Sequence, residues 1–366
     1  MSDNLFDRLF ELFQSPGPVN WKLAREVSRS MAGARQPVDP RLAEEYLGLA
    51  LAAELRLTEM PGLGTPSSRS IEPVDQATWV EENQQSFGYM IEPLADRFGS
   101  QPGSTPMTEI FSSLAPALLG MQAGTMVGTL GHTVMGQFDA GMPPLEHDRR
   151  YAVVPNIEGF AAYGGLDPQQ VRMWAVLHEI AFHTIMDVPW LRGHIVSVVG
   201  DLLSSIEVDP ERLAGQIGSI SSPEQLEEML GESTDLSSLM GIEVDRSRSA
   251  PVEALVAFIE GYGDFAVAGA SRGLLPDHDR IAAAAAARRS GDEATRSLEI
   301  AGVTLSRSGA ADAAQLCTEV AERWGTDALA RVWEAPEHLP TIEELADPVG
   351  WAARVLLPLG DLGLDT

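Results

Sequence analysis

The sequence predicts a mainly α protein with little sheet. Apolar residues recur at helical spacing along most of the chain, whereas the alternation typical of strands is scarce. The chain has 366 residues, of which 44% are hydrophobic, so it can bury a large core. The clearest strand pattern is YAVVPNI at 151–157, and a Pro/Gly/Ser-rich loop is expected at 60–75.

Six segments carry the helical periodicity and are expected to be helices. One of them has a clear start, because Asp167 can cap the helix and Pro168 suits its first position. The Ala-rich stretch at 282–287 also favours a helix and needs no functional explanation. The six expected helices are 40–57, 76–97, 106–137, 168–187, 251–269 and 310–334.

The length allows one large domain or two ordinary ones, and we expect a single domain over 1–366. The pattern leaves room within it for a helical N-terminal subdomain at 1–105. Residues 201–250 are rich in Asp, Glu and Ser with broken periodicity, so we expect a surface insertion there.

Charge and cysteine content exclude several classes of partner and site. The chain has 25 Lys and Arg against 53 Asp and Glu, a net charge of -28, so we expect no nucleic-acid partner. The most membrane-like stretch, 114–130, is interrupted by Pro116 and Gln122, and we expect a core helix and no membrane partner. Cys317 is the single cysteine, which excludes an internal disulfide and a thiolate metal cage. The first residues, MSDNLFDRLFELF, do not form a signal peptide, which favours a cytoplasmic location.

The segment VRMWAVLHEIAFHTIMDVPWL at 171–191 carries the chemical signal. A helix displaying His178 and Glu179 is typical of zinc peptidases, where a second histidine four residues later completes the pattern. Phe182 occupies that place, and His183 follows one residue later. A spacing of five separates side chains by roughly 140° on a regular helix, against roughly 40° for four. His183 could join His178 only if the helix bulged, and the alternative is two ordinary histidines.

Several other segments resemble one known family. They include GPVNWKLAREV at 17–27, ATWVEENQQSF at 77–87, AGTMVGTLGHTVMGQFD at 123–139, YAVVPNIEGF at 151–160, LDPQQVRMWAVLHE at 166–179 and ALARVWEAPEHLPTIEELADPVGWAARV at 328–355. In these segments the chain resembles the zincin-like type 2 metallopeptidases of actinobacteria and related bacteria. The resemblance covers most of the chain and implies a zincin-like metallopeptidase fold, mainly α (α+β), with a buried active-site helix and little sheet.

The resemblance also implies roles for individual residues. His178 corresponds to the first zinc ligand and Glu179 to the general base, while the second ligand falls on Phe182. The family's Glu-Gly motif resembles IEGYGDF at 259–265, which places the third ligand on Glu260, with Asp264 one turn later. A salt-bridged or capping acid remains the alternative for Glu260.

We therefore expect a zincin-like protein with a degenerate metal site, impaired or inactive as a peptidase, which would make it a pseudoenzyme. Zinc is the implied cofactor, and Phe182 argues against its retention. The alternative is an active metal-dependent peptide hydrolase with a remodelled site using His183 or His194, so enzymatic activity stays open. In either case a peptide or protein ligand in the cleft is the expected partner.

Overall fold

The computed structural model describes residues 17–60, 62–67, 69–99, 106–145, 149–206, 246–289, 291, 299–300, 303–304 and 309–357. The prediction of a mainly α protein is confirmed, since helices make up most of these residues. Most of the expected surface insertion, 207–245, lies outside the described residues.

The first half of the chain supplies long helices, and α3 matches its prediction closely. Asp39 caps α3 through the backbone N–H of Arg41, with Pro40 in the first turn. The elements are α2 (Trp21–Ala32), α3 (Pro40–Thr58), β1 (Ile71–Val74), α4 (Gln76–Glu82), η1 (Gly88–Met90), α5 (Glu92–Gly99), α6 (Pro106–Thr133) and β2 (Arg150–Val153).

The second half begins with the central helices and ends in a group of short ones. The elements are α7 (Val154–Gly164), α8 (Pro168–Met186), α9 (Leu191–Ser204), α13 (Arg246–Ser271), α14 (His278–Arg289), β3 (Glu299–Ile300), β4 (Val303–Thr304), α16 (Ala310–Trp324), α17 (Thr326–Ala330), η2 (Arg331–Trp333), η3 (Pro336–His338), η4 (Glu344–Ala346) and α18 (Pro348–Leu356).

Four predicted segments differ from the structure. The expected helix 76–97 is broken into α4, η1 and α5, and Asn83 forms the C-terminal cap of α4, with its buried side-chain amide bonded to the Trp79 carbonyl and to Gln137. The expected helix 106–137 ends at Thr133. The expected helix 310–334 breaks at Gly325, whose φ of 90° is unfavourable for other residues. The strand expected at 151–157 stops at Val153, where Pro155 suits the first turn of α7.

The loop expected at 60–75 ends in a strand that the sequence did not predict. β1 pairs in parallel with β2, with Ile71 opposite Arg150 and Val74 opposite Val153. On the other side of β2, Ala152 pairs with Gly136 in an antiparallel bridge. β2 therefore has backbone partners on both edges and is buried along its length.

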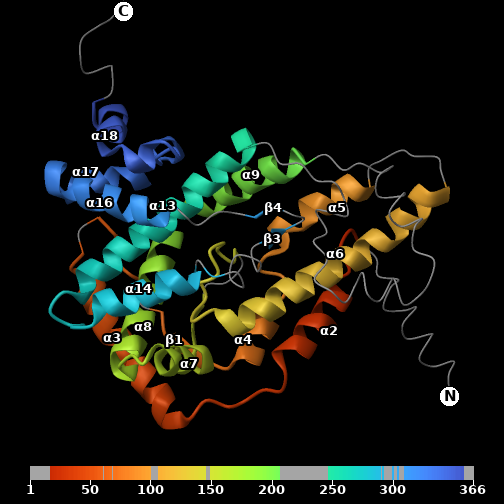
Figure 1. The fold of residues 1–366 in the computed structure, drawn as a ribbon, viewed down its shortest axis with the longest axis horizontal. Coiled ribbons are helices and arrows are strands. Elements are labelled where there is room, and N and C mark those ends of the chain that lie inside the picture. The colour runs from red at the N-terminus through yellow and green to blue at the C-terminus, as the bar shows by residue number, and fades with distance from the viewer. Residues whose placement is uncertain are drawn as a thin grey trace, which may run out of the picture.

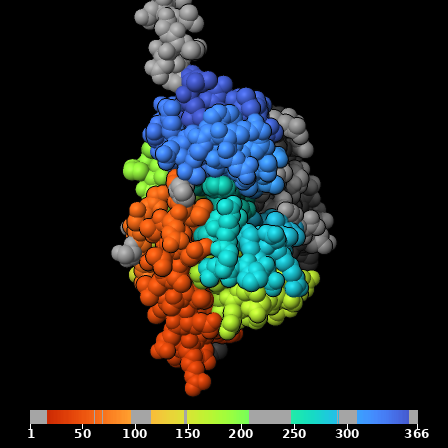
Figure 2. Space-filling model, turned by 90° about the vertical axis from the view of Figure 1, so that its left-hand side faces the viewer, coloured from red at the N-terminus to blue at the C-terminus, as the bar shows by residue number. Residues whose placement is uncertain are grey.

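Helix α8 forms the centre of the core. Its residues from Met173 to Met186 are all buried, which fits a helix that is apolar nearly all round. It packs against α3, α7, α13 and β2, with α14 nearby (Figure 1). The helices α16 to α18 gather at one end of the molecule, where they are coloured blue (Figure 2). Within the described residues, no helix is long and apolar enough to cross a membrane.

Candidate functional site

The site lies on α8, which starts as the sequence predicts. The Asp167 carboxylate accepts a hydrogen bond from the Gln170 backbone N–H at 2.9 Å, and Pro168 occupies the first turn. The helix then runs without a bulge from Pro168 to Met186. Its regular geometry keeps His178 and His183 on different sides, so the bulge needed to bring them together is absent from this helix.

His178 is buried in an aromatic stack. Its imidazole lies 4.1 Å from the Phe182 ring, centroid to centroid, with the planes 20° apart, and 5.2 Å from Trp174. Burial lowers the pKa of His178 to about 4, so the ring is neutral near pH 7. Its Nε2 atom has no hydrogen-bond partner among the described residues and is a ligand-type atom.

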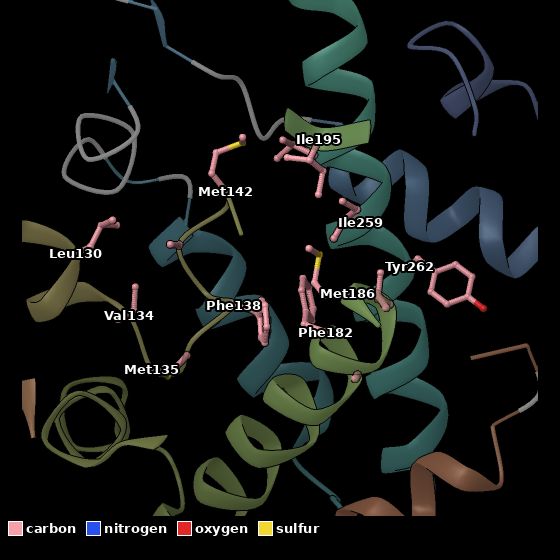
Figure 3. Packing of buried hydrophobic residues seen from close by; sticks show 14 of the residues in the cluster. Leu130, Val134, Met135, Phe138, Met142, Phe182, Met186, Ile195, Ile259 and Tyr262 are labelled. Carbon is pink, nitrogen blue, oxygen red and sulfur yellow. The ribbon is translucent and has the colours of Figure 1, made fainter. Parts of the chain in front are cut away.

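Phe182 fills the space between His178 and α13. A Cβ atom added to Gly263 of α13 would lie only 2.1 Å from Cε2 of the Phe182 ring, so the phenyl group touches the backbone of that helix. Figure 3 shows Phe182 projecting from α8 beside Met186, with Ile259 of α13 nearby and Phe138 on the other side. Because Glu260 is one turn from Gly263, the ring stands between His178 and the helix that carries the expected third ligand.

Glu179 is held by backbone donors on both of its carboxylate oxygens. Oε2 accepts hydrogen bonds from the N–H groups of Gln137 at 2.8 Å and Phe138 at 3.3 Å. Oε1 accepts one from the N–H of Tyr151 at 3.1 Å. Burial raises the pKa of Glu179 to about 8, even though these three donors oppose the shift. The side chain therefore joins α8 to β2 and to the segment before β2, and both of its oxygens are engaged.

The segment before β2, residues 134–139, follows the edge of that strand. The Val153 N–H donates to the Met135 carbonyl at 2.9 Å, next to the bridge between Gly136 and Ala152. A Cβ at Gly136 would lie 2.4 Å from Glu179 Oε2, so only glycine allows this close approach. The edge of β2 that an extended peptide could have joined is therefore occupied by the chain itself.

Glu260 and Asp264 lie one turn apart on α13 and share a buried arginine. The Arg289 guanidinium is 8% exposed and lies 2.7 Å from the Asp264 carboxylate. Burial would lower the pKa of Arg289, but attraction to Asp264, Glu260 and Asp139 raises it above its ordinary value. Glu260 itself is 3% exposed. Sequence reasoning did not identify Arg289, because nothing local marks the last residue of α14 as a partner of α13.

A second acid and arginine lie beside the first pair. Buried Asp139 accepts a hydrogen bond from the Met135 N–H at 2.9 Å and contacts Arg288, whose guanidinium also donates to the Thr133 carbonyl. Burial would raise the pKa of Asp139, but Arg288, with smaller help from His178 and Arg289, holds it at about 2. No local sequence pattern distinguishes Asp139 or Arg288 from the other charged residues, so neither was predicted.

His183 belongs to a different cluster. Its Nε2 atom lies 2.9 Å from the Arg69 guanidinium, and its Nδ1 atom lies 3.5 Å from the Asp187 carboxylate. Its ring meets Phe138 edge to face at 5.6 Å. Burial lowers the pKa of His183 to about 4. The structure therefore brings His178 close to the acids of α13, and it does not bring His183 to them.

His194 is also placed away from this arrangement. It lies on α9, half-buried, with its ring edge to face against Trp190 at 5.8 Å. Across the described part of the chain, no three His, Cys, Asp or Glu side chains are grouped so that they could hold one metal ion.

The fold is mainly helical and is centred on a buried helix that carries adjacent His178 and Glu179, the first part of the zinc-peptidase pattern. The sequence profile of the zincin-like metallopeptidases matches residues 19–352. The chain therefore belongs to the zincin-like metallopeptidase family.

One solved structure has the same fold. It is a protein from Chloroflexus aurantiacus described as a candidate hydrolase with a novel fold. The two share 24% sequence identity with a TM-score of 0.65, over 92% of this chain and 98% of the other. No match was found among curated proteins.

The family implies zinc, and the residues present can be compared with what this ion needs. His178 Nε2 is available, but Phe182 stands where the second ligand is expected, and Glu179 has both oxygens bonded to the backbone. Arg289 already pairs with Asp264 and is attracted by Glu260, so a cation is present beside both acids. A catalytic zinc site needs three protein ligands and a water. The described residues do not fit such a centre.

Proposed function

We propose that this chain is a zincin-like protein whose peptidase chemistry is impaired and which acts by binding rather than by zinc-assisted hydrolysis. One observation carries the proposal: the Phe182 ring stacks on His178 and touches α13 at Gly263. A phenyl group offers no lone pair to a metal ion, and here it also fills the space between His178 and α13 at Gly263. Loss of one ligand weakens metal binding, and loss of the space weakens it further.

The state of Glu179 supports the same proposal. The general base of a zinc peptidase must be ionised and must reach the metal-bound water. The Glu179 carboxyl instead bonds through both oxygens to three backbone N–H groups, and burial raises its pKa to about 8. These contacts support a role for Glu179 in joining α8, β2 and residues 134–139.

A peptide or protein is the ligand class that we propose, because the family is named for peptidases. The net charge of -28 disfavours nucleic acid as the alternative. Strand addition to β2 is not part of the proposal, since residues 134–139 already occupy that edge. The rival function is a metal-dependent hydrolase with a remodelled site, and the available Nε2 atom of His178 is the observation that favours it.

The test is the metal content of the protein purified without chelator and then incubated with excess zinc. We expect far less than one zinc per chain after removal of free metal, and no peptide hydrolysis that depends on zinc. His178→Ala tests the site directly, and His132→Ala is the matched control for a histidine outside it. About one zinc per chain that is lost in His178→Ala and kept in His132→Ala would refute the proposal and support the hydrolase.

A further inference from the structure

The last two residues of α14 place two positive charges beside the acids of the candidate site. Arg289 reaches Asp264 at 2.7 Å and is attracted by Glu260 and Asp139, while Arg288 contacts Asp139. Arg289 and Asp139 are 8% and 6% exposed, whereas the side chains of Asp264 and Arg288 are 30% and 27% exposed, so each pair joins a buried charge to a partly exposed one. Buried charges must be paired, because removing an ion from water is costly.

This cluster already contains two cationic side chains, which weakens its attraction for a metal ion. Three carboxylates, from Asp139, Glu260 and Asp264, face two guanidinium groups, and all five act on one another or on His178. A divalent ion placed among them would meet the two arginines at short range, where repulsion is strong in a medium of low dielectric constant.

We propose that Arg289 replaces the metal ion, so that its guanidinium is the resident cation that pairs with Asp264, attracts Glu260 and joins α14 to the core. The inference rests on the proposed function, in which Phe182 stands in place of a metal ligand. It adds that an arginine side chain takes the place of the metal ion itself. A guanidinium suits this place because it stays charged when buried and offers several N–H donors to carboxylates.

The first experiment measures thermal stability in metal-free buffer. Arg289→Ala leaves buried Glu260 and partly exposed Asp264 without the guanidinium of Arg289, and we expect the Tm to fall by about 5 °C. Arg323→Ala is the matched control, because it removes an arginine from the exposed ion pair with Glu319 and should leave the Tm nearly unchanged.

The double variant Arg289→Ala with Asp264→Asn keeps the test decisive if the single variant does not fold. Removing both partners leaves less uncompensated charge, so we expect a higher Tm than in the single variant. A Tm of Arg289→Ala equal to that of Arg323→Ala would overturn the proposal. A double variant no more stable than the single variant would also overturn it.

The second experiment measures zinc content. Phe182→His supplies the missing imidazole next to His178, but Arg289 still occupies the cation's place, so we expect little zinc. Adding Arg289→Ala removes the competing charge, and we expect about one zinc per chain. Equal zinc content in the two variants, at either level, would overturn the role of Arg289. Stoichiometric zinc in the unaltered protein would instead overturn the proposed function, so the two failures can be told apart.

Discussion

The contact between Phe182 and Gly263 gives the sharpest prediction about the site. A Cβ at Gly263 would lie 2.1 Å from Cε2 and 2.5 Å from Cζ of the Phe182 ring. Carbon atoms in good contact lie about 3.5–4.0 Å apart, so the ring would have to move by more than about 1 Å. It cannot move freely, because it is 3% exposed and stacked on His178.

We expect Gly263→Ala to lower the free energy of unfolding by about 2 kcal/mol. Overpacking costs about 1–3 kcal/mol, and the better helix propensity of alanine returns up to about 1 kcal/mol. In a Phe182→Ala background the collision is gone, so the same substitution should instead raise stability by up to about 1 kcal/mol. The coupling energy between the two positions should therefore be about 3 kcal/mol.

The assay is urea unfolding followed by tryptophan fluorescence and circular dichroism, for the two single variants and the double variant. Gly159→Ala is the matched control, because Gly159 lies inside α7 and a Cβ added there would meet no atom within 4 Å. It should be neutral or slightly stabilising. If Gly263→Ala cost the same with and without the phenyl ring, Phe182 would not fill the space beside α13, and the basis of the proposed function would be lost.

Two further predictions concern neighbouring groups. Gly136→Ala should lower the free energy of unfolding by about 2–3 kcal/mol, because the added Cβ would lie 2.4 Å from Glu179 Oε2 and displace that carboxyl group. Urea unfolding measures this change, and an unchanged free energy would contradict the prediction. Burial lowers the pKa of His183 to about 4, whereas the same group titrates near about 6.5 in the unfolded chain. The stabilisation that neutral His183 gives the folded protein is therefore complete above about pH 6.5 and is lost as the pH falls toward 4. His183→Gln should therefore reduce the stability difference between about pH 7.5 and pH 5 by about 2 kcal/mol, whereas equal pH dependence would refute it.

Local sequence signals were sufficient for some elements and insufficient for others. The Asp167 cap and the proline after it predicted the start of α8 correctly. β1 was missed because Pro73 lies inside it and because its partner, β2, is remote in sequence. The break at Gly325 was missed because helical periodicity continues on both sides of it.

The sequence by itself determined that the protein is mainly helical and that Phe182, four residues after His178, stands where a zinc peptidase has its second histidine. Both conclusions depend on helical geometry, which is fixed by spacing along the chain. Only the tertiary structure decided what surrounds these residues. Arg289 is 25 residues from Asp264, and Gln137 is 42 residues from Glu179, so these contacts arise from packing between elements and leave no local pattern. The departure of Phe182 from the expected histidine was therefore visible in the sequence, whereas the pairing of Arg289 with Asp264 was not.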